Sequence, residues 1–299
     1  MPMFGVHLYP TDYSMDPVQV VKAAEERGLD SVTYPEHTHI PTSRKTPFPS
    51  EGELPKYYAE LLDPFIVLAA AASVTRRIKL GTGVCLITEH DPIVLAKQIA
   101  SLDVICRGRL FLAIGAGWNA EEMENHGTRL KTRSLVTRER VLAMKRIWSN
   151  AEAEFHGRFV DFDPIWSWPK PVQPGGPPVL LGSGSPKAIE RVMDFCDGWY
   201  PPGFLSDLEF YRSGITTLRA WASRAERRLE NVHLSTQLGV VENADRARRL
   251  LEVGFTHLLF SIFPAPADKT LSLLDRYAEL AETLRREFGS SASPGALDG

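Results

Sequence analysis

The chain has 299 residues, of which 43% are hydrophobic, and it is long enough for one large α/β barrel or two ordinary domains. Its 34 Lys and Arg residues nearly balance 37 Asp and Glu residues, so no global field attracts nucleic acid or an anionic membrane. The cysteines Cys85, Cys106 and Cys196 form no Cys-x-x-Cys pair, which argues against a disulfide framework or a zinc ribbon and suits a reducing compartment. We therefore expect a cytoplasmic protein whose partner is a small molecule.

Neither targeting nor membrane insertion is indicated by the sequence. The N-terminus lacks the basic segment of a signal peptide, and the longest apolar run, residues 65–72, is too short to cross a bilayer. We expect an unprocessed chain that neither spans a membrane nor binds nucleic acid.

Short aliphatic or β-branched runs alternate along the chain with longer segments of helical periodicity. The strand-like runs are residues 4–8, 31–34, 78–84, 110–114, 179–181, 198–200, 234–240 and 257–262. The helical segments are residues 16–27, 63–74, 91–105, 134–148, 186–195, 207–229, 244–253 and 269–288. This alternation is typical of βαβ units and a parallel sheet, and eight units favour closure. The sequence predicts an α/β fold, a single (β/α)₈ TIM barrel over residues 1–288 with a disordered tail at 289–299.

Two stretches exceed a minimal barrel. Residues 39–61 follow the second strand, are rich in Pro, Ser and Thr, and are placed to cover the mouth of a site. Residues 150–178 precede the fifth strand and contain a hairpin-like segment at 155–159. We expect the individuality of this protein to lie in these insertions.

The carboxyl ends of barrel strands supply catalytic and binding groups, so each strand end is a candidate site. The second strand is followed by Glu36 and His37. A histidine there can donate or accept a proton near neutral pH, and Glu36 can orient it or serve the structure. The alternative, a loop histidine without chemical role, has equal weight on this evidence alone.

Glycines interrupt the ends of the third and fourth strands. Residues 81–85 read Gly-Thr-Gly-Val-Cys, which indicates a bulge or a close approach of the backbone to a flat ligand. Residues 115–119 read Gly-Ala-Gly-Trp-Asn, without the third glycine of a dinucleotide-binding fingerprint. No basic group flanks Cys85, so we expect a buried apolar role for it. Glu121 and Glu122 begin a short helix, where acidic residues serve the helix dipole as readily as catalysis.

After the fifth strand comes the small-residue loop Gly182-Ser183-Gly184-Ser185, followed by Pro186. Ser185 suits the N-cap of the next helix and Pro186 its first turn. Such a loop points several backbone donors and the positive end of a helix at one spot, as a phosphate requires. We favour a phosphate site over an ordinary capped turn.

Taken together, these strand ends resemble the bacterial-luciferase-like family of flavin- and deazaflavin-dependent oxidoreductases. The matching stretches, in family order, are residues 28–32, 36–37, 78–84, 96–103, 108–118, 170–173, 182–185 and 197–199. Each motif alone is weak, but their shared order over most of the chain makes the resemblance specific at family level. It is slightly closer to actinobacterial members that use the deazaflavin coenzyme F420.

The resemblance implies a cofactor, either coenzyme F420 or FMN, and a homodimer. The cofactor ring would lie across the third-strand bulge, with a non-prolyl cis peptide between Gly83 and Val84. His37 falls where deazaflavin-using relatives place a histidine near the reactive carbon, so it is the candidate catalytic residue. The implied cofactor-binding residues are Thr82, Gly83, Val84, Gly115, Gly117, Trp118, Asn119, Gly182, Ser183, Gly184 and Ser185.

One departure and two alternatives qualify this interpretation. Sugar-phosphate dehydrogenases of the family carry an acidic residue directly after the fourth-strand Gly-x-Gly, whereas Trp118 stands here, which puts sugar-phosphate oxidation in doubt. His37 and His39 could instead ligate zinc in a metal-dependent barrel hydrolase, although no further ligands are evident. The third hypothesis is a non-catalytic flavin-binding relative.

Overall fold

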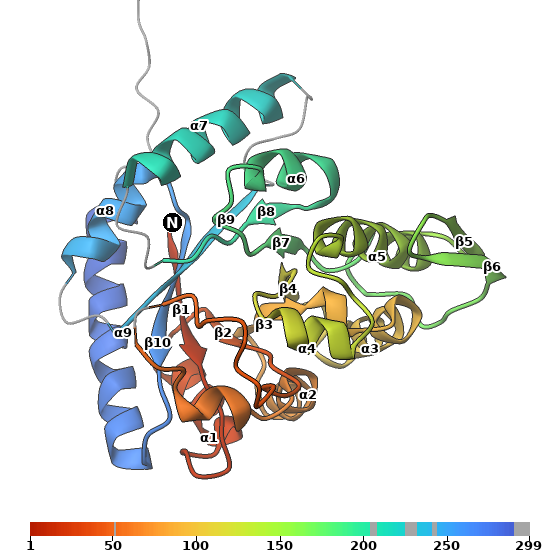
Figure 1. Ribbon diagram of the computed structural model, residues 1–299. Helices are drawn as coiled ribbons and strands as arrows, with labels where there is room; N and C mark the ends of the chain where they lie inside the picture. The colour runs from red at the N-terminus through yellow and green to blue at the C-terminus, as the bar shows by residue number, and fades with distance from the viewer. Residues whose placement is uncertain (51, 204–207, 225–231, 241–243, 290–299) are drawn as a thin grey trace, which may run out of the picture.

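The computed structural model describes residues 1–50, 52–203, 208–224, 232–240 and 244–289. Its barrel strands are β1 (Met3–Leu8), β2 (Ser31–Tyr34), β3 (Lys79–Leu86), β4 (Leu110–Gly115), β7 (Val179–Leu181), β8 (Gly198–Trp199), β9 (His233–Leu238) and β10 (His257–Ile262). All eight are parallel and close in the order β1-β10-β9-β8-β7-β4-β3-β2 (Figure 1). The predicted (β/α)₈ barrel is confirmed.

Helices surround the strands on the outside of the barrel (Figure 1). They are α1 (Pro17–Glu26), α2 (Pro64–Val74), α3 (Pro92–Ile105), α4 (Ala120–Asn125), α5 (Arg133–Ser149), α6 (Ala188–Phe195), α7 (Leu208–Arg224), α8 (Asp245–Val253) and α9 (Ala267–Gly289), with short 3₁₀ segments η1 (Lys56–Ala59) and η2 (Ile87–Glu89). The ends of the expected helix at 207–229, and the expected tail beyond residue 289, lie outside the described residues. Among the described helices, none combines the length and apolarity needed to cross a membrane.

Three of the early helices begin with the same device. The carboxylates of Asp16, Asp63 and Asp91 accept hydrogen bonds from amides of the first turns of α1, α2 and α3, and a proline follows each aspartate. The aspartate accepts from first-turn N–H groups that have no partner within the helix. The proline fixes φ at a helical value and has no N–H that would need a partner. These Asp-Pro pairs made the helix starts predictable from the sequence.

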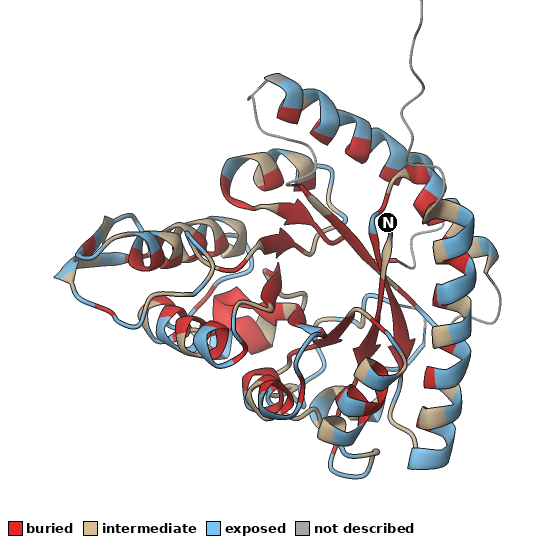
Figure 2. Ribbon diagram, turned by 180° about the vertical axis from the view of Figure 1, so that it is seen from behind, coloured by how far each residue is buried: buried red, intermediate tan, exposed pale blue. Residues whose placement is uncertain are grey.

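Strand side chains are buried on both faces, as Figure 2 shows by the red strands inside the ring of helices. Phe4, Leu80, Leu112 and Phe260 are fully buried. Parallel strands covered by helices outside and by one another inside read as continuous apolar runs for this reason. The structure thus explains the consecutive apolar residues of the predicted strands.

The second insertion forms a hairpin that projects from the barrel beside α5 (Figure 1). Its strands β5 (Ala153–His156) and β6 (Asp161–Ile165) pair antiparallel, as predicted from the sequence around residues 155–159. The chain then returns to the barrel through Gln173, whose amide N–H and side chain donate to Asp103 at 3.0 and 2.8 Å. This contact ties the insertion to α3.

One helix start differs from its prediction. α6 begins at Ala188 with Lys187 as its N-cap, not at Pro186 with Ser185 as the cap. Ser185 instead accepts a backbone bond from Ala188 N and donates its own amide to Ser183 Oγ at 3.2 Å. The hydroxyl of Ser183 captures the amide locally, so a turn replaces the first expected turn of helix.

Val84 is held between two glycines at the rim of the barrel. The peptide Gly83–Val84 is cis and a register shift interrupts the β3–β4 ladder there, as expected from the family resemblance and the glycine pattern. A Cβ on Gly115 would lie 2.7 Å from Val84 Cγ2, and one on Gly182 would lie 2.5 Å from Val84 Cγ1. These positions are glycine because the Val84 side chain already fills the space.

This packing makes Gly115 and Val84 energetically coupled. We expect Gly115→Ala to lower the free energy of unfolding by about 1–3 kcal/mol, since the new methyl overlaps Val84. Val84→Ala combined with Gly115→Ala should recover most of that loss, because the clash is removed. Urea unfolding of the single and double variants measures the coupling, and Gly239→Ala, whose Cβ would meet nothing within 4 Å, is the control. Additive losses would contradict this packing.

Candidate active site

A cavity of about 750 Å³ opens at the carboxyl ends of the barrel strands. Gly83, Gly115 and Gly182 all line it, which confirms that the glycine-rich ends of three strands share one mouth. Its size falls in the range of sites that take drug-sized ligands and cofactors. This cavity is the candidate active site.

Nine of the twelve sequence-predicted site residues line this cavity. They are His37, Gly83, Val84, Gly115, Gly117, Trp118, Gly182, Ser183 and Ser185. The other three do not line it: Thr82 Oγ1 donates to the Ala113 carbonyl at 2.8 Å, Asn119 caps α4 through Glu122 N, and Gly184 is exposed. Thr82 and Asn119 therefore have structural roles.

Hydroxyl groups and arginines surround the loop after β7. Ser183 Oγ donates to Ser185 Oγ at 3.1 Å, and Arg191 Nη1 donates to Ser185 Oγ at 3.3 Å. Trp199 Nε1 holds the loop from behind through the Ser183 carbonyl at 2.9 Å. The amides of Gly182 and Ser185 are already engaged, which leaves those of Ser183 and Gly184 as candidate donors.

Two arginines that the sequence did not indicate as site residues also line this polar end of the cavity. Arg133 and Ser134 from α5, and Arg191 from α6, line the cavity together with the serines of the loop. Thr137 lines it too, and its Oγ1 is buried without a hydrogen-bond partner. These residues lie in the first turns of α5 and α6 and belong to no sequence motif, so only the fold identifies them.

His37 faces a buried carboxylate. Its Nδ1 lies 2.9 Å from both carboxylate oxygens of Glu122, a side chain only 1% exposed. A carboxylate accepts from Nδ1–H and so fixes the tautomer, which leaves the lone pair on Nε2. Nε2 accepts a long hydrogen bond of 3.4 Å from Trp118 Nε1. The sequence interpretation left Glu122 undecided between capping and catalysis, and the structure shows it as the partner of His37.

Glu36, beside His37, serves the structure. Its Oε2 accepts from Leu86 N at 2.6 Å and its Oε1 bonds His90 Nε2 at 2.8 Å. Burial raises the pKa of the adjacent Cys85 thiol well above its usual value, so this cysteine is not an activated nucleophile. Glu36 thus fixes the strand end that carries the Gly83–Val84 bulge.

A third buried carboxylate, Glu89, contacts Thr38, the residue after His37. Burial, with the nearby charge of Glu122, raises the pKa of Glu89 to about 8. Thr38 Oγ1 donates to Glu89 at 3.0 Å, and His126 Nε2 lies 2.9 Å from the same hydroxyl. At neutral pH Glu89 is therefore mostly protonated, which spares this region two adjacent negative charges.

The zinc hypothesis gains no support from the geometry. His39 turns to Thr38 and Asn125, with both ring nitrogens engaged at 2.9 and 2.8 Å, while His37 faces Glu122. In the described part of the chain, the cluster with metal-ligand spacing is Glu36, Cys85 and His90, and it includes neither predicted ligand. His7, at the end of β1, does not itself line the cavity: it is buried beneath Tyr9, its Nδ1 lies 2.9 Å from Thr33 Oγ1, and burial lowers its pKa to about 3.

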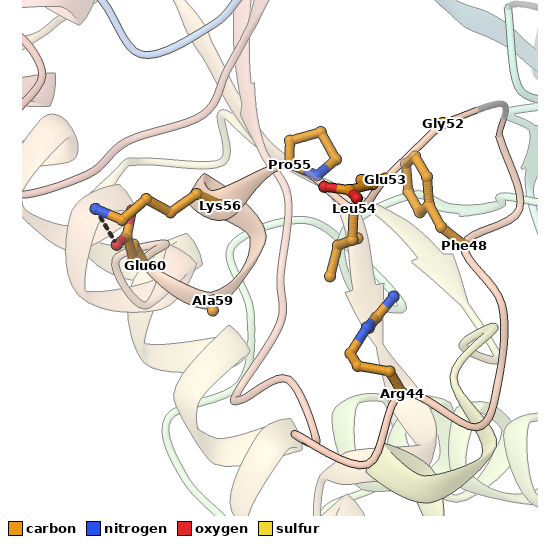
Figure 3. Close-up of a pocket in the computed structure, with 9 residues that line it drawn as sticks. All are labelled: Arg44, Phe48, Gly52, Glu53, Leu54, Pro55, Lys56, Ala59 and Glu60. Atoms are coloured by element: carbon orange, nitrogen blue, oxygen red, sulfur yellow. Dashed lines mark ion pairs between the residues drawn. The ribbon is translucent and has the colours of Figure 1, made fainter.

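The first insertion covers one side of the cavity mouth, as its position predicted. Phe48, Tyr57 and Tyr58 from this segment line the cavity. A smaller groove of about 450 Å³ is lined by residues of the insertion itself (Figure 3). The Lys56–Glu60 ion pair (2.7 Å) lies at one end of this groove. The groove shares only Phe48 and Pro55 with the main cavity, so it borders the site rather than forming it.

Glu121 anchors the insertion to α4. Its carboxylate accepts from Thr46 N at 2.9 Å and from the Thr46 hydroxyl. The hydrogen bond from the Thr46 hydroxyl is the main cause that lowers the pKa of Glu121 to about 2. The two neighbouring carboxylates thus have different partners: Glu121 binds the insertion and Glu122 binds His37.

A closed barrel with a ligand-sized cavity at its carboxyl rim defines a (β/α)₈-barrel protein built like an enzyme. Residues 7–297 match the model of the luciferase-like monooxygenase family. The chain is 36% identical over 279 residues to an uncharacterized protein of Mycobacterium tuberculosis, covering 92% of this chain and 97% of that protein. It is 26% identical over 236 residues to the F420-dependent glucose-6-phosphate dehydrogenase of Gordonia bronchialis, covering 76% and 64%.

Among solved structures, one neighbour is the oxygenating constituent of 3,6-diketocamphane monooxygenase of Pseudomonas putida in complex with FMN. Its TM-score is 0.63 at 18% identity, with 97% of this chain and 79% of that chain covered. The chain belongs to the luciferase-like monooxygenase family, as the sequence motifs indicated. Its relatives include both F420- and FMN-dependent oxidoreductases.

The Glu121 anchor can be tested directly. We expect Glu121→Gln to loosen the insertion and to accelerate trypsin cleavage after Arg44 and Lys45 at neutral pH, whereas Glu124→Gln on the same helix should not. In the unaltered protein the anchor is complete above the ordinary glutamate pKa of about 4.3 and is lost as the pH falls towards about 2, because the folded-state pKa is depressed. Hydrogen exchange at the Thr46 amide should rise over that interval; equal cleavage of both variants would contradict the anchor.

Proposed function

We propose that this protein is an oxidoreductase that transfers a hydride between coenzyme F420 and a small organic substrate, with His37 as its proton donor and acceptor. The observation that carries the proposal is the pairing of His37 Nδ1 with buried Glu122 at the cavity wall, 2.9 Å apart. A histidine that is oriented by a carboxylate and lines a ligand-sized cavity is an arrangement suited to general acid–base catalysis.

The residues of the cavity fit an isoalloxazine-type cofactor with a phosphate tail. Ser183, Ser185 and Arg191 offer hydroxyl and guanidinium donors for a phosphate, and Arg133 adds a second positive charge. The unpartnered hydroxyl of Thr137 suits a ligand hydroxyl or phosphate oxygen along the same wall. Gly83, Val84 and Gly115 present backbone and one small side chain, which suits a flat ring. When bound, the cofactor supplies the hydride donor or acceptor.

His37 would carry the substrate's proton. In substrate oxidation, His37 Nε2 would accept the proton of the substrate hydroxyl, and in reduction the imidazolium would return it. The Glu122 carboxylate would stabilise that imidazolium and hold the ring in place. The indole N–H of Trp118 donates to His37 Nε2 at 3.4 Å and would turn to the substrate oxygen once Nε2 is protonated.

Monooxygenation with reduced FMN is the second candidate. Aromatic side chains from the insertion wall off one side of the cavity, and exclusion of water is what oxygen chemistry on a flavin requires. The donors around Ser183 and Ser185 would serve the FMN phosphate equally. The two candidates differ in the cofactor that binds.

A cofactor titration tests the site. We expect the purified protein to bind F420 or FMN, and Arg191→Ala to weaken that binding about 10- to 100-fold, since a charge-assisted hydrogen bond contributes about 1.5–3 kcal/mol. Arg212→Ala, on the exposed face of α7, is the matched control. Spectral changes of each cofactor report binding and identify it. An unchanged dissociation constant for Arg191→Ala would remove the proposed phosphate site.

His37 is tested by kinetics. His37→Ala should lower kcat about 10²- to 10⁴-fold with nearly unchanged cofactor affinity, because proton transfer is lost while binding contacts remain. His39→Ala, in the same loop but outside the cavity lining, is the control. Loss of stoichiometric metal in His37→Ala would favour the hydrolase instead, and full activity of the variant would leave His37 without a catalytic role. Absence of turnover in the unaltered protein with either cofactor would favour the non-catalytic relative.

We further propose a cytoplasmic homodimer. The cysteines Cys85, Cys106 and Cys196 are free and buried, which suits a reducing compartment. The adjacent helices α2 and α3 expose Ile66 (72%) and Val94 (56%), an apolar surface of the kind that partner chains cover. Light scattering on the purified protein measures the mass of the assembly.

A further inference from the structure

Aromatic side chains form a continuous arc along one side of the cavity. The arc consists of Phe263, Tyr9, Tyr57, Tyr58, Phe48 and Trp118, each of which lines the cavity. Consecutive ring centroids lie 5.1, 5.2, 5.1, 5.4 and 5.9 Å apart in that order. These spacings are typical of packed aromatic pairs, so the arc is one preformed surface.

Most of the arc faces the polar end of the cavity across the barrel, and its Trp118 end follows β4, the neighbour of β7. Tyr9 and Phe263 follow β1 and β10, and the insertion follows β2; these three strands are neighbours in the barrel. Ser183 and Ser185 follow β7, which stands four strands from β1 in either direction round the eight-stranded ring. A cofactor with its phosphate on the β7 loop would therefore leave the arc for the second ligand.

Charged groups are distributed unequally between the two ends. Among the described lining residues, the arginines are Arg133 and Arg191, both from helices on the β7 side. The lining carboxylate, Glu36, is already bonded to Leu86 N and His90. Burial raises the pKa of Tyr9, which keeps its hydroxyl neutral. The arc thus offers a charged ligand no countercharge, and desolvating an unpaired charge is costly.

The polar groups at the His37 end of the arc suit a ligand that carries one hydroxyl or carbonyl group. His37, 5.8 Å from Trp118 and 5.4 Å from Tyr58 between ring centroids, closes one end of the arc. The Gln237 amide nitrogen is engaged by the Tyr9 hydroxyl and Ser261 Oγ, each at 3.0 Å. Trp118 Nε1 donates to His37 Nε2 at 3.4 Å, so a ligand hydroxyl or carbonyl at this end of the arc would meet both nitrogens by replacing that long contact.

From these observations we infer that the second ligand is a neutral, flat, largely apolar ring compound carrying a hydroxyl or carbonyl group, which stacks on the aromatic arc with its oxygen towards His37. The inference rests on the proposed function only in assigning the β7 end to the cofactor. It excludes sugar phosphates and other anions as substrates of this site, in agreement with the presence of Trp118 where sugar-phosphate dehydrogenases carry an acidic residue.

Three probes that share a naphthalene ring but differ in the charge of their substituent test this inference. Calorimetry measures binding of 2-naphthol, naphthalene-2-sulfonate and 2-naphthyltrimethylammonium to the full-length protein, with and without saturating cofactor. We expect 2-naphthol to bind at least tenfold more tightly than either charged probe. Tighter or equal binding of the sulfonate would overturn the inference, and so would tighter or equal binding of the ammonium, which aromatic faces attract through cation–π interaction.

Variants at Phe48 place the binding on the arc. Phe48→Leu keeps the site apolar but removes one ring, and should weaken 2-naphthol binding about two- to tenfold. Phe48→Arg supplies the missing cation, and should raise sulfonate affinity at least tenfold while 2-naphthol affinity falls. Trp166→Arg, at a hairpin tryptophan that is 77% exposed, is the matched control and should change neither. Unchanged probe selectivity in both Phe48 variants, with circular dichroism showing intact folds, would overturn the inference.

The outcomes separate this inference from the proposed function. The cofactor titration measures binding at the β7 end of the cavity, whereas the naphthalene probes measure binding on the arc. Neutral selectivity without binding of F420 or FMN would refute the proposed cofactor and support the ligand class. Cofactor binding with charge-indifferent probes would refute the ligand class and leave the proposed function standing.

Discussion

Closure of eight parallel strands is the constraint on which the rest of this structure depends. Because every barrel strand points the same way, residues from strand ends far apart in the sequence converge on one rim. The rim must also accommodate the Val84 side chain, which it does by having no Cβ at Gly115 and Gly182. The same glycines that suggest a ligand site from the sequence thus have a packing cause, and the ligand surface is made by Val84 as much as by the glycines around it.

Buried carboxylates organise the region between β2 and α4, and each has a separate task. Glu36 holds the end of β3 and the His90 ring, and Glu122 orients His37. Glu121, one residue away and only partly buried, fastens the insertion through Thr46. A fully buried carboxylate must satisfy its oxygens with fixed donors, whereas a partly buried one is also solvated by water.

The cavity therefore has two chemically unlike ends. Serine hydroxyls and arginines line the cavity near β7, and most rings of the aromatic arc lie on the side of β1, β10 and the insertion that follows β2. Such a division lets one cavity hold two ligands in a fixed order, since each end disfavours the other's ligand through desolvation. The His37–Glu122 pair lies at the end of the aromatic arc, where the two ligands would meet.

The sequence by itself determined the alternation of strands and helices, the Asp-Pro helix starts, the hairpin and the family, because each depends on local periodicity, capping or motif order. It also identified His37 and the glycine-rich strand ends. Several features could not be predicted from it. The Ser185 amide donates to the Ser183 hydroxyl, so α6 begins later than expected. The side chains of Asn119 and Thr82 bond to the backbone instead of lining the cavity. The Glu122 partner of His37, the arginines beside the β7 loop and the aromatic arc were decided only by the tertiary structure, because no sequence motif or spacing marks these contacts.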